Sequence, residues 1–95
     1  MHYRITKVHH NPKDRDKLIE ILESKEKILN SFDGLKYVRM IGVTDSVAIA
    51  ISEYESEEHL KNVEPRFQEL MVDLMPLMSE PPEIYNGDVF WKHNN

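Results

Sequence analysis

The stretch VAIAISEY, residues 47–54, constrains the architecture more than any other part of the chain. Successive side chains of a β-strand point to opposite faces of the sheet. Both faces of this strand are apolar, with Val47, Ile49 and Ile51 on one and Ala48 and Ala50 on the other. A strand of this kind is normally covered on both sides. The domain itself therefore has to cover one face, and a second layer has to cover the other.

Local signals before this stretch predict two strands and one helix. Thr44-Asp45-Ser46 is typical of a tight turn, which joins it to a strand at 35–43. Residues 2–10 alternate loosely and predict a first strand. Between these strands, Asn11-Pro12 favours the start of a helix and Asp33-Gly34 favours its end. We therefore predict one helix over residues 12–32.

Local signals after it predict two helices and a last strand. Ser56 is a good N-cap for a helix at 56–63. Pro65 lacks an amide donor and clashes one turn back, so this helix ends there and another runs from Pro65 to about residue 75. A proline-rich loop then precedes a last strand at about 88–93.

The order of these elements is strand, helix, strand, strand, helix, strand. We predict an α+β fold, the ferredoxin-like βαββαβ unit, with a four-stranded antiparallel sheet and both helices on one face. Residues 1–95 then form a single domain. The helix-free face is apolar, and an exposed apolar sheet of this size marks an interface. We therefore predict a homodimer that packs sheet against sheet.

Composition excludes several kinds of partner. The chain has no cysteine, so disulfides and thiolate metal sites are excluded. Its formal charge is −5 and it has no basic stripe, which makes nucleic acid a poor partner. No apolar run is long enough to cross a membrane, and the N-terminal residues lack the apolar block of a signal peptide. We expect a cytoplasmic protein.

Three stretches carry a resemblance to a known family: ISEYESEEHL at 51–60, VEPRFQELMVDLMPLM at 63–78 and GDVFWK at 87–92. Over nearly its whole length the chain resembles the dimeric α/β-barrel superfamily, and most closely its antibiotic-biosynthesis-monooxygenase-like (ABM) branch. Members of that superfamily include cofactor-independent oxygenases, haem-degrading enzymes, lactone isomerases, stress proteins and sensory ligand-binding modules. The resemblance therefore implies a fold more than a reaction.

The haem-degrading branch is similar in layout but uses other residues. Its enzymes carry an Asn on the first strand and a Trp and a His on the broken helix. The positions that roughly align with these hold Thr6, Val63 and Met71 in this chain. The resemblance therefore implies chemistry without haem, and we predict no cofactor.

The five histidines do not predict a metal site. His9 and His10 are adjacent, so they point to opposite faces of a strand. If the first strand pairs antiparallel with the last, His2 lies near His93. His9 and His10 then lie near Asp88 at the other end. Eight residues of strand separate the two groups by about 26 Å, at roughly 3.3 Å per residue. We predict no bound metal.

His10 is the candidate catalytic base. It shares the helix-facing side of the first strand with Thr6, where this fold keeps its internal cleft. We expect the third strand to run parallel to the first, so that Tyr54 ends near His10. A neutral imidazole there can act as a general base near pH 7. The alternative is a surface histidine at a strand exit beside a helix cap.

Three further residues join Thr6 as candidate substrate contacts. Tyr54 and Phe67 are aromatic residues beside the expected cleft and suit a planar ligand, and they would equally fill a core or an interface. Arg39 lies on an otherwise apolar strand face. A buried arginine there needs a carboxylate across the dimer or an anionic ligand.

Two hypotheses for function follow. The first is a cofactor-independent monooxygenase, an oxidoreductase that acts on a small aromatic or quinol-type molecule with His10 as the base. The second is a non-catalytic dimeric module that binds a small hydrophobic ligand or has a stress-response role. The small residues Ala48, Ala50 and Ser52 separate the two in part, because a ligand can enter only if they leave room beneath the helices.

Overall fold

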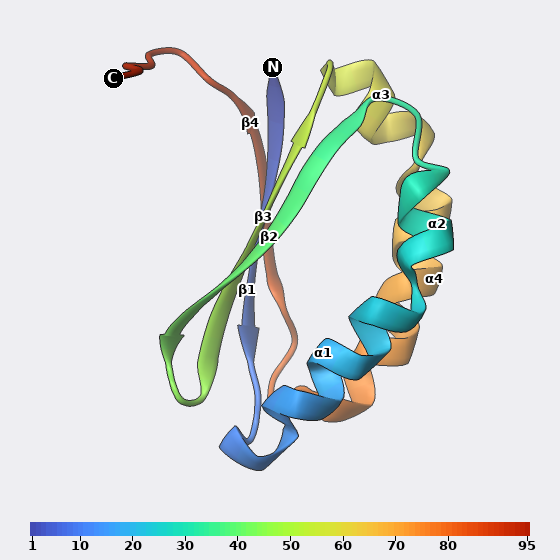
Figure 1. Ribbon diagram of the computed structural model, residues 1–95, viewed down its shortest axis with the longest axis vertical. Helices are drawn as coiled ribbons and strands as arrows, with labels where there is room; N and C mark the ends of the chain where they lie inside the picture. Colours follow the sequence, from blue (N-terminus) through green and yellow to red (C-terminus); the bar gives the residue numbers. More distant parts are fainter.

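The structure is a computed structural model that describes residues 1–95. It contains one four-stranded sheet, and the helices cover one face of that sheet (Figure 1). The strand order is β2-β3-β1-β4, and every pairing is antiparallel. The predicted α+β, ferredoxin-like order is confirmed. The elements are β1 (His2–His9), the 3-10 turn η1 (Pro12–Asp14), α1 (Arg15–Ser24), α2 (Glu26–Asn30), β2 (Leu35–Thr44), β3 (Val47–Tyr54), α3 (Glu57–Asn62), α4 (Glu64–Leu74), the 3-10 turn η2 (Met75–Leu77) and β4 (Glu83–Asp88).

The prediction of one helix over residues 12–32 is wrong. The segment is a 3-10 turn followed by α1 and α2, which are separated at Lys25. The hydroxyl of Ser24 donates a hydrogen bond to the carbonyl of Ile21 at 2.6 Å. A bond of this kind competes with the regular helical ladder and bends a helix. Figure 1 shows the change of direction between α1 and α2.

The predicted break near Pro65 is confirmed. α3 ends at Asn62 and α4 begins at Glu64, which puts Pro65 in the first turn of α4. A proline is tolerated there because its missing amide has no helical partner in any case. Ser56 also caps α3 as predicted, since its hydroxyl accepts a hydrogen bond from the amide of His59 at 3.2 Å.

The direction of β3 corrects another prediction. β3 runs antiparallel to β1, not parallel to it, with His2 opposite Tyr54 and His9 opposite Val47. The helical crossover returns the chain so that β2 runs in the direction of β1, and the tight β2–β3 hairpin then reverses it. Tyr54 therefore lies beside His2, at the far end of β1 from His10.

The last strand also differs from its prediction. β4 covers Glu83–Asp88, whereas the apolar composition of residues 88–93 favours a strand there. The β1–β4 register ends where His2 pairs with Asp88, and beyond it only the amide of Val89 bonds to the chain beside it, at the Met1 carbonyl (3.2 Å). Residues 89–95 instead leave the sheet as a C-terminal arm (Figure 1).

Two apolar clusters form the core on the helix side of the sheet. One, where α1 meets α4, consists of Leu18, Leu70, Met71 and Leu74. The other, around α3 and the end of β3, consists of Phe32, Tyr54, Leu60 and Val63. Full burial of side chains of this size contributes roughly 1.5–3 kcal/mol each. The core therefore lies on one face of the sheet only.

The opposite face of the sheet has no cover within the chain. Its exposed apolar residues are Ile5, Ile41, Val43 and Tyr85. The C-terminal arm adds Phe90 and Trp91, which are 99% and 74% exposed. An apolar surface of this extent is typical of an interface.

Gly34, between α2 and β2, provides a test of this fold. Its φ is +82°, and a Cβ at this position would lie 2.3 Å from Cδ2 of the His59 ring. Gly34→Ala should therefore lower the free energy of unfolding by about 1–3 kcal/mol, through backbone strain and steric overlap. Urea unfolding measures this change. Gly87→Ala is the matched control, since nothing lies within 4 Å of a Cβ there. Equal losses in the two variants would contradict the geometry at Gly34.

Candidate functional site

Small side chains on the helix-facing side of β3 leave a cavity beneath the helices. Ala50 and Ser52 are the small residues, and they lie opposite Thr6 and Arg4 of β1. The space between them and the helices has a volume of about 60 Å³ and is called the inner cavity below. Besides these four residues and Tyr54, its wall is apolar: Val8, Leu22, Leu29, Phe32, Val38, Met40, Phe67, Leu70, Met71, Leu74 and Met78.

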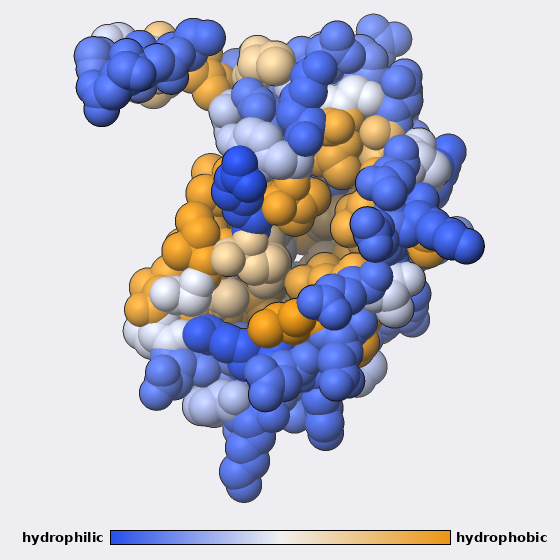
Figure 2. Space-filling view, viewed as in Figure 1, coloured by the Kyte–Doolittle hydropathy of each residue, from blue (hydrophilic) through white to orange (hydrophobic).

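The inner cavity adjoins an open groove at the edge of the sheet. The groove runs between α1–α2 and β2 and has a volume of about 740 Å³. Figure 2 shows a hollow with apolar residues around it on this side of the molecule. The residues that line both spaces are Leu22, Leu29, Phe32, Val38 and Met40. A ligand would reach the inner cavity past these side chains.

Arg4 is the one charged side chain that lines the inner cavity, and it is 1% exposed. Its Nη2 donates a hydrogen bond to Oε2 of Glu64, at the start of α4. Its guanidinium carbon lies 3.5 Å from the centroid of the Phe67 ring, a cation–π contact. Nε and Nη1 are buried and have no hydrogen-bond partner. Buried donors almost always have a partner, so these two need an explanation.

Tyr54 places a neutral hydroxyl group near this charge. Tyr54 is 2% exposed, and its ring centroid lies 5.8 Å from the guanidinium carbon of Arg4. Burial raises the pKa of the Tyr54 hydroxyl, and the positive charge of Arg4 offsets only part of that effect. The hydroxyl therefore stays protonated at neutral pH and has a proton to donate.

His10 is buried at the other end of β1, and both of its ring nitrogens have neighbours. Nδ1 lies 2.8 Å from the Asn11 carbonyl, which can only accept, so Nδ1 carries the proton. Nε2 faces Arg15, whose Nη2 and Nε lie 3.2 and 3.4 Å away. Arg15 also donates from Nη2 to the Thr44 carbonyl at 2.6 Å. The lone pair that a general base would use is thus turned towards a guanidinium.

The structure brings together three of the predicted site residues. Thr6, Tyr54 and Phe67 all line the inner cavity. His10 lies on the helix-facing side of β1, as predicted, but it lines a separate cavity of about 110 Å³. The two cavities share Leu22 and Met40 in their walls. The expected neighbourhood of His10 and Tyr54 is wrong, because β3 runs antiparallel to β1.

Arg39 does not belong to the inner cavity. Its neighbours Val38 and Met40 face the helices and line the cavity, so Arg39 faces the other way, where it is exposed. Its guanidinium carbon lies 4.4 Å from the centroid of the Tyr37 ring. Arg39 thus has an aromatic neighbour on the helix-free face of the sheet.

Arg4 is a site residue that is absent from the residues predicted above. The signal was its register, since Arg4 shares the face of Thr6, Val8 and His10, and the helices cover that face. A charge on a covered face needs a partner, so the register makes Arg4 a candidate site residue beside His10.

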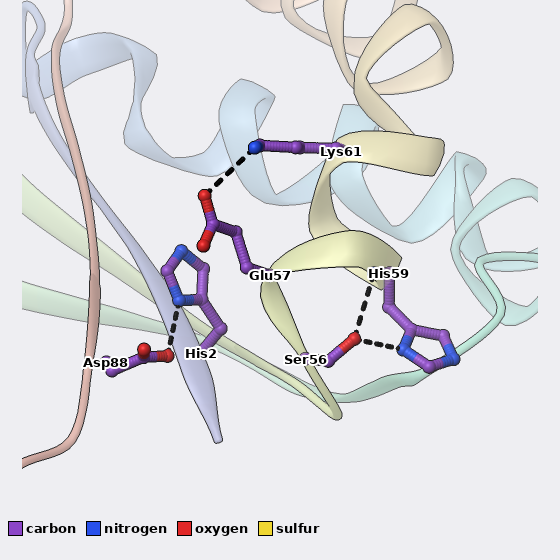
Figure 3. Close-up of polar contacts among 6 residues, drawn as sticks. All are labelled: His2, Ser56, Glu57, His59, Lys61 and Asp88. Carbon is purple, nitrogen blue, oxygen red and sulfur yellow. Dashed lines mark hydrogen bonds and ion pairs between the residues drawn. The ribbon is translucent and has the colours of Figure 1, made fainter.

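The histidines lie apart, but not where the sequence predicts. Nδ1 of His2 lies 2.6 Å from Oδ1 of Asp88 rather than near His93, because β4 ends at Asp88 (Figure 3). At the other end of β1, Nε2 of His9 lies 3.7 Å from Oε2 of Glu83. No group of three or more His, Cys, Asp or Glu side chains could hold a metal ion. No helix is both long and apolar enough to cross a membrane.

Comparisons with known proteins identify the fold. No protein-family model matches the chain, and no curated protein matches it in sequence. A solved structure of a monooxygenase from the gene ActVA-Orf6 of Streptomyces coelicolor, in complex with Nanaomycin D, does match. Its TM-score is 0.84 at 18% identity, and the match covers 99% of this chain and 91% of that one. The chain has the ABM fold.

Two more solved structures match the chain over most of its length. An antibiotic biosynthesis monooxygenase matches with a TM-score of 0.74 at 11% identity, over 94% of this chain and 98% of that one. A protein of unknown function from Nitrosomonas europaea matches with a TM-score of 0.76 at 15% identity, over 99% and 93%. The TM-scores confirm the predicted fold. Because the identities are this low, the activity has to be argued from the site.

The raised pKa of Tyr54 predicts a loss of stability in alkali. Tyr3 contributes to the same loss, because hydrogen bonds with Tyr37 and Glu53 raise its pKa as well. A tyrosine whose pKa is raised by folding contributes stability below its ordinary value of 10.0, and this contribution is lost as the pH rises above that value. Tyr54→Phe should therefore flatten, without abolishing, the fall in the free energy of unfolding above pH 10.0.

Urea unfolding at a series of pH values measures this effect. The reference is the native protein over the same series, because the other three tyrosines lie on the helix-free face that the proposed dimer covers. If Tyr54→Phe leaves the pH dependence unchanged, the burial of Tyr54 does not shift its titration.

Proposed function

We propose that this protein is a homodimeric, cofactor-independent monooxygenase that acts on a small aromatic or quinol-type molecule. The observation that carries the proposal is the apolar inner cavity, which adjoins a groove and contains one buried cation beside one neutral phenol. The Streptomyces coelicolor monooxygenase, which has the same fold, was solved in complex with Nanaomycin D. An apolar cavity with a few polar groups is the usual form of a small-molecule site.

The proposed reaction needs no cofactor because a quinol supplies the electrons itself. A base removes a proton from the substrate, and the resulting carbanion reacts with dioxygen. One oxygen atom enters the ring as a hydroxyl group, the other leaves as water, and the quinol becomes a quinone. An apolar cavity supports this chemistry because it keeps water away from the reactive anion.

His10 is the proposed base, since it is the only histidine that lines either cavity. For this role Arg15 has to move away from Nε2 of His10. Its guanidinium occupies the lone pair that would take the substrate proton, and it has no acceptor for a protonated Nε2. Thr6, Tyr54 and Phe67 are the proposed substrate contacts. Arg39 faces away from the cavity, and we assign it to the dimer interface instead.

Oxygen consumption tests the proposed reaction. The native protein should consume dioxygen with at least one member of a panel of quinols. His10→Gln should lower that rate by about 100-fold or more, the usual contribution of a general base. His9→Gln is the matched control, because the adjacent side chain points to the other face of β1. Unchanged turnover in His10→Gln would remove His10 as the base, and no uptake with any quinol would remove the enzymatic function.

A specific observation favours a second candidate, a non-catalytic dimeric module that binds a small ligand or has a stress-response role. The inner cavity of about 60 Å³ is much smaller than the roughly 300–1,000 Å³ of most ligand pockets. The Nε2 lone pair of His10 is also directed at Arg15. Ligand binding without oxygen consumption would support this candidate.

The proposed homodimer rests on the helix-free face of the sheet. Ile49 and Ile51 of β3 are only half-buried there, beside the exposed apolar residues of the other strands. A second copy presents the same surface, so a two-fold pairing covers both faces at once. The C-terminal arm borders this face, where Phe90 and Trp91 line a shallow groove together with Ile5.

Light scattering tests the dimer. The native protein should have roughly twice the monomer mass of 11.2 kDa at micromolar concentration. Ile5→Lys should shift it to the monomer, because it places an unpaired charge in the apolar interface. Val72→Lys, at an exposed position on α4, is the control and should remain dimeric. A monomeric native protein, or an equal effect of both variants, would contradict packing through the sheet.

A further inference from the structure

Arg4 has more hydrogen-bonding capacity than its surroundings use. It is 1% exposed, and an arginine guanidinium carries five N–H donors and no acceptor. Only Nη2 has a partner, while Nε and Nη1 are buried without one. A donor in this position is normally satisfied by protein, water or a ligand. Because Arg4 lines the inner cavity, an occupant of that cavity is the natural partner.

The partner that Arg4 already has does not saturate it. Glu64 contacts Nη2 with Oε2, and its side chain is 43% exposed. Its other oxygen, Oε1, accepts a hydrogen bond from Nε2 of Gln68 at 3.0 Å. The carboxylate is therefore shared with a second donor and lies towards the surface. The side of the guanidinium that carries Nε and Nη1 has no acceptor.

The lining of the inner cavity favours a negative group at this place. No aspartate or glutamate lines it, and Arg4 is its only charged residue. Tyr54, Thr6 and Ser52 add hydroxyl groups to an otherwise apolar wall. At about 60 Å³ the cavity admits one small group, while the body of a ligand would stay in the adjoining groove.

We infer that the inner cavity binds the oxyanion of a planar, weakly acidic ligand, a phenol or an enol, with Arg4 as the counter-ion and Tyr54 as a hydrogen-bond donor, while the rest of the ligand lies in the adjoining groove. This inference rests on the proposed function, since it names the chemical class of the ligand that enters the same cavity. It makes Arg4 a binding residue and gives a reason for its two free donors.

A weak acid fits the site better than a permanent anion. Glu64 already balances much of the charge of Arg4, so a carboxylate or phosphate would bring an excess charge out of water into an apolar wall. A phenol can cross the groove in its neutral form. It then loses its proton next to the guanidinium, where an opposite charge stabilises the anion.

A coloured phenol tests the inference directly. The probe is 4-nitrophenol, whose anion absorbs visible light and whose neutral form does not. At a pH below the probe's own pKa, the native protein should increase the absorbance of the nitrophenolate. The apparent pKa of the bound probe should fall by about one unit or more, the usual effect of an opposite charge at close range. 4-Nitroanisole, which cannot ionise, measures binding that is independent of charge.

Two variants separate the role of the charge from that of the shape. Arg4→Gln keeps donors but removes the charge, and it should abolish the shift while 4-nitroanisole still binds. Glu64→Gln removes the competing carboxylate from a half-exposed position, and it should strengthen binding of the anion several-fold. If Arg4→Gln does not fold, Glu64→Gln alone decides, because its effect has the opposite sign from that of lost packing.

The outcomes distinguish the two levels of the proposal. If 4-nitroanisole binds but the native protein leaves the ionisation of 4-nitrophenol unchanged, the inference is overturned and the proposed ligand site stands. If neither probe binds, the ligand site itself is overturned. A shift that persists in Arg4→Gln, or that Glu64→Gln weakens, would assign the anion to another part of the molecule.

Discussion

One layer of helices can cover only one face of a sheet, and this sheet is apolar on both. The helices α1 and α4 cover one face, and their apolar residues, among them Leu18, Leu70 and Leu74, form the core on that side. No further helix is present for the other face. Burial of apolar surface is the main favourable term in folding, and an apolar face left without cover is typical of an interface. This constraint connects the sequence of β3 to the proposed homodimer.

The same strand also creates the inner cavity. Ala48, Ala50 and Ser52 are small, and the space left above them forms the inner cavity, lined by Ala50 and Ser52, and the cavity beside His10, lined by Ala48. Larger residues there would strengthen the core, because well-filled interiors gain contacts that a void lacks. The strand is therefore bulky on the side that faces outwards and small on the side that faces the helices. This asymmetry explains why an apolar surface and an apolar cavity occur together.

Periodicity and caps predicted the elements well, because they are local properties. β3 and the break before α4 follow from side-chain alternation and from a proline that lacks a donor. Alternation is the same in both directions along a strand, however, so it could not show that β3 runs antiparallel to β1. The last strand failed for a different reason. Propensity favoured residues 88–93, but the register of β4 against β1 places the paired residues at 83–88, and this register depends on the sheet and not on local composition.

For the site, the sequence predicted which face is enclosed but not which polar groups would remain free. Thr6, Tyr54 and Phe67 follow from the enclosed face alone. The choice between His10 and Arg4 depends on partners from distant segments, which only the fold brings together. Arg15 and the Asn11 carbonyl occupy both nitrogens of His10, while Glu64 reaches only one nitrogen of Arg4.

The three nitrogen-bearing side chains among residues 2–10 that face the helices, His2, Arg4 and His10, therefore differ in a way that bears on function. His2 has Asp88, and His10 has Asn11 and Arg15, so each end of the strand is held by neighbours of its own chain. Arg4 lies between them on a strand that pairs on both sides, with β3 and with β4. A buried charge with free donors lowers stability, and here it is fixed in place by two hydrogen-bonded ladders. Rigid placement of an unsatisfied group suits recognition of a ligand better than it suits folding.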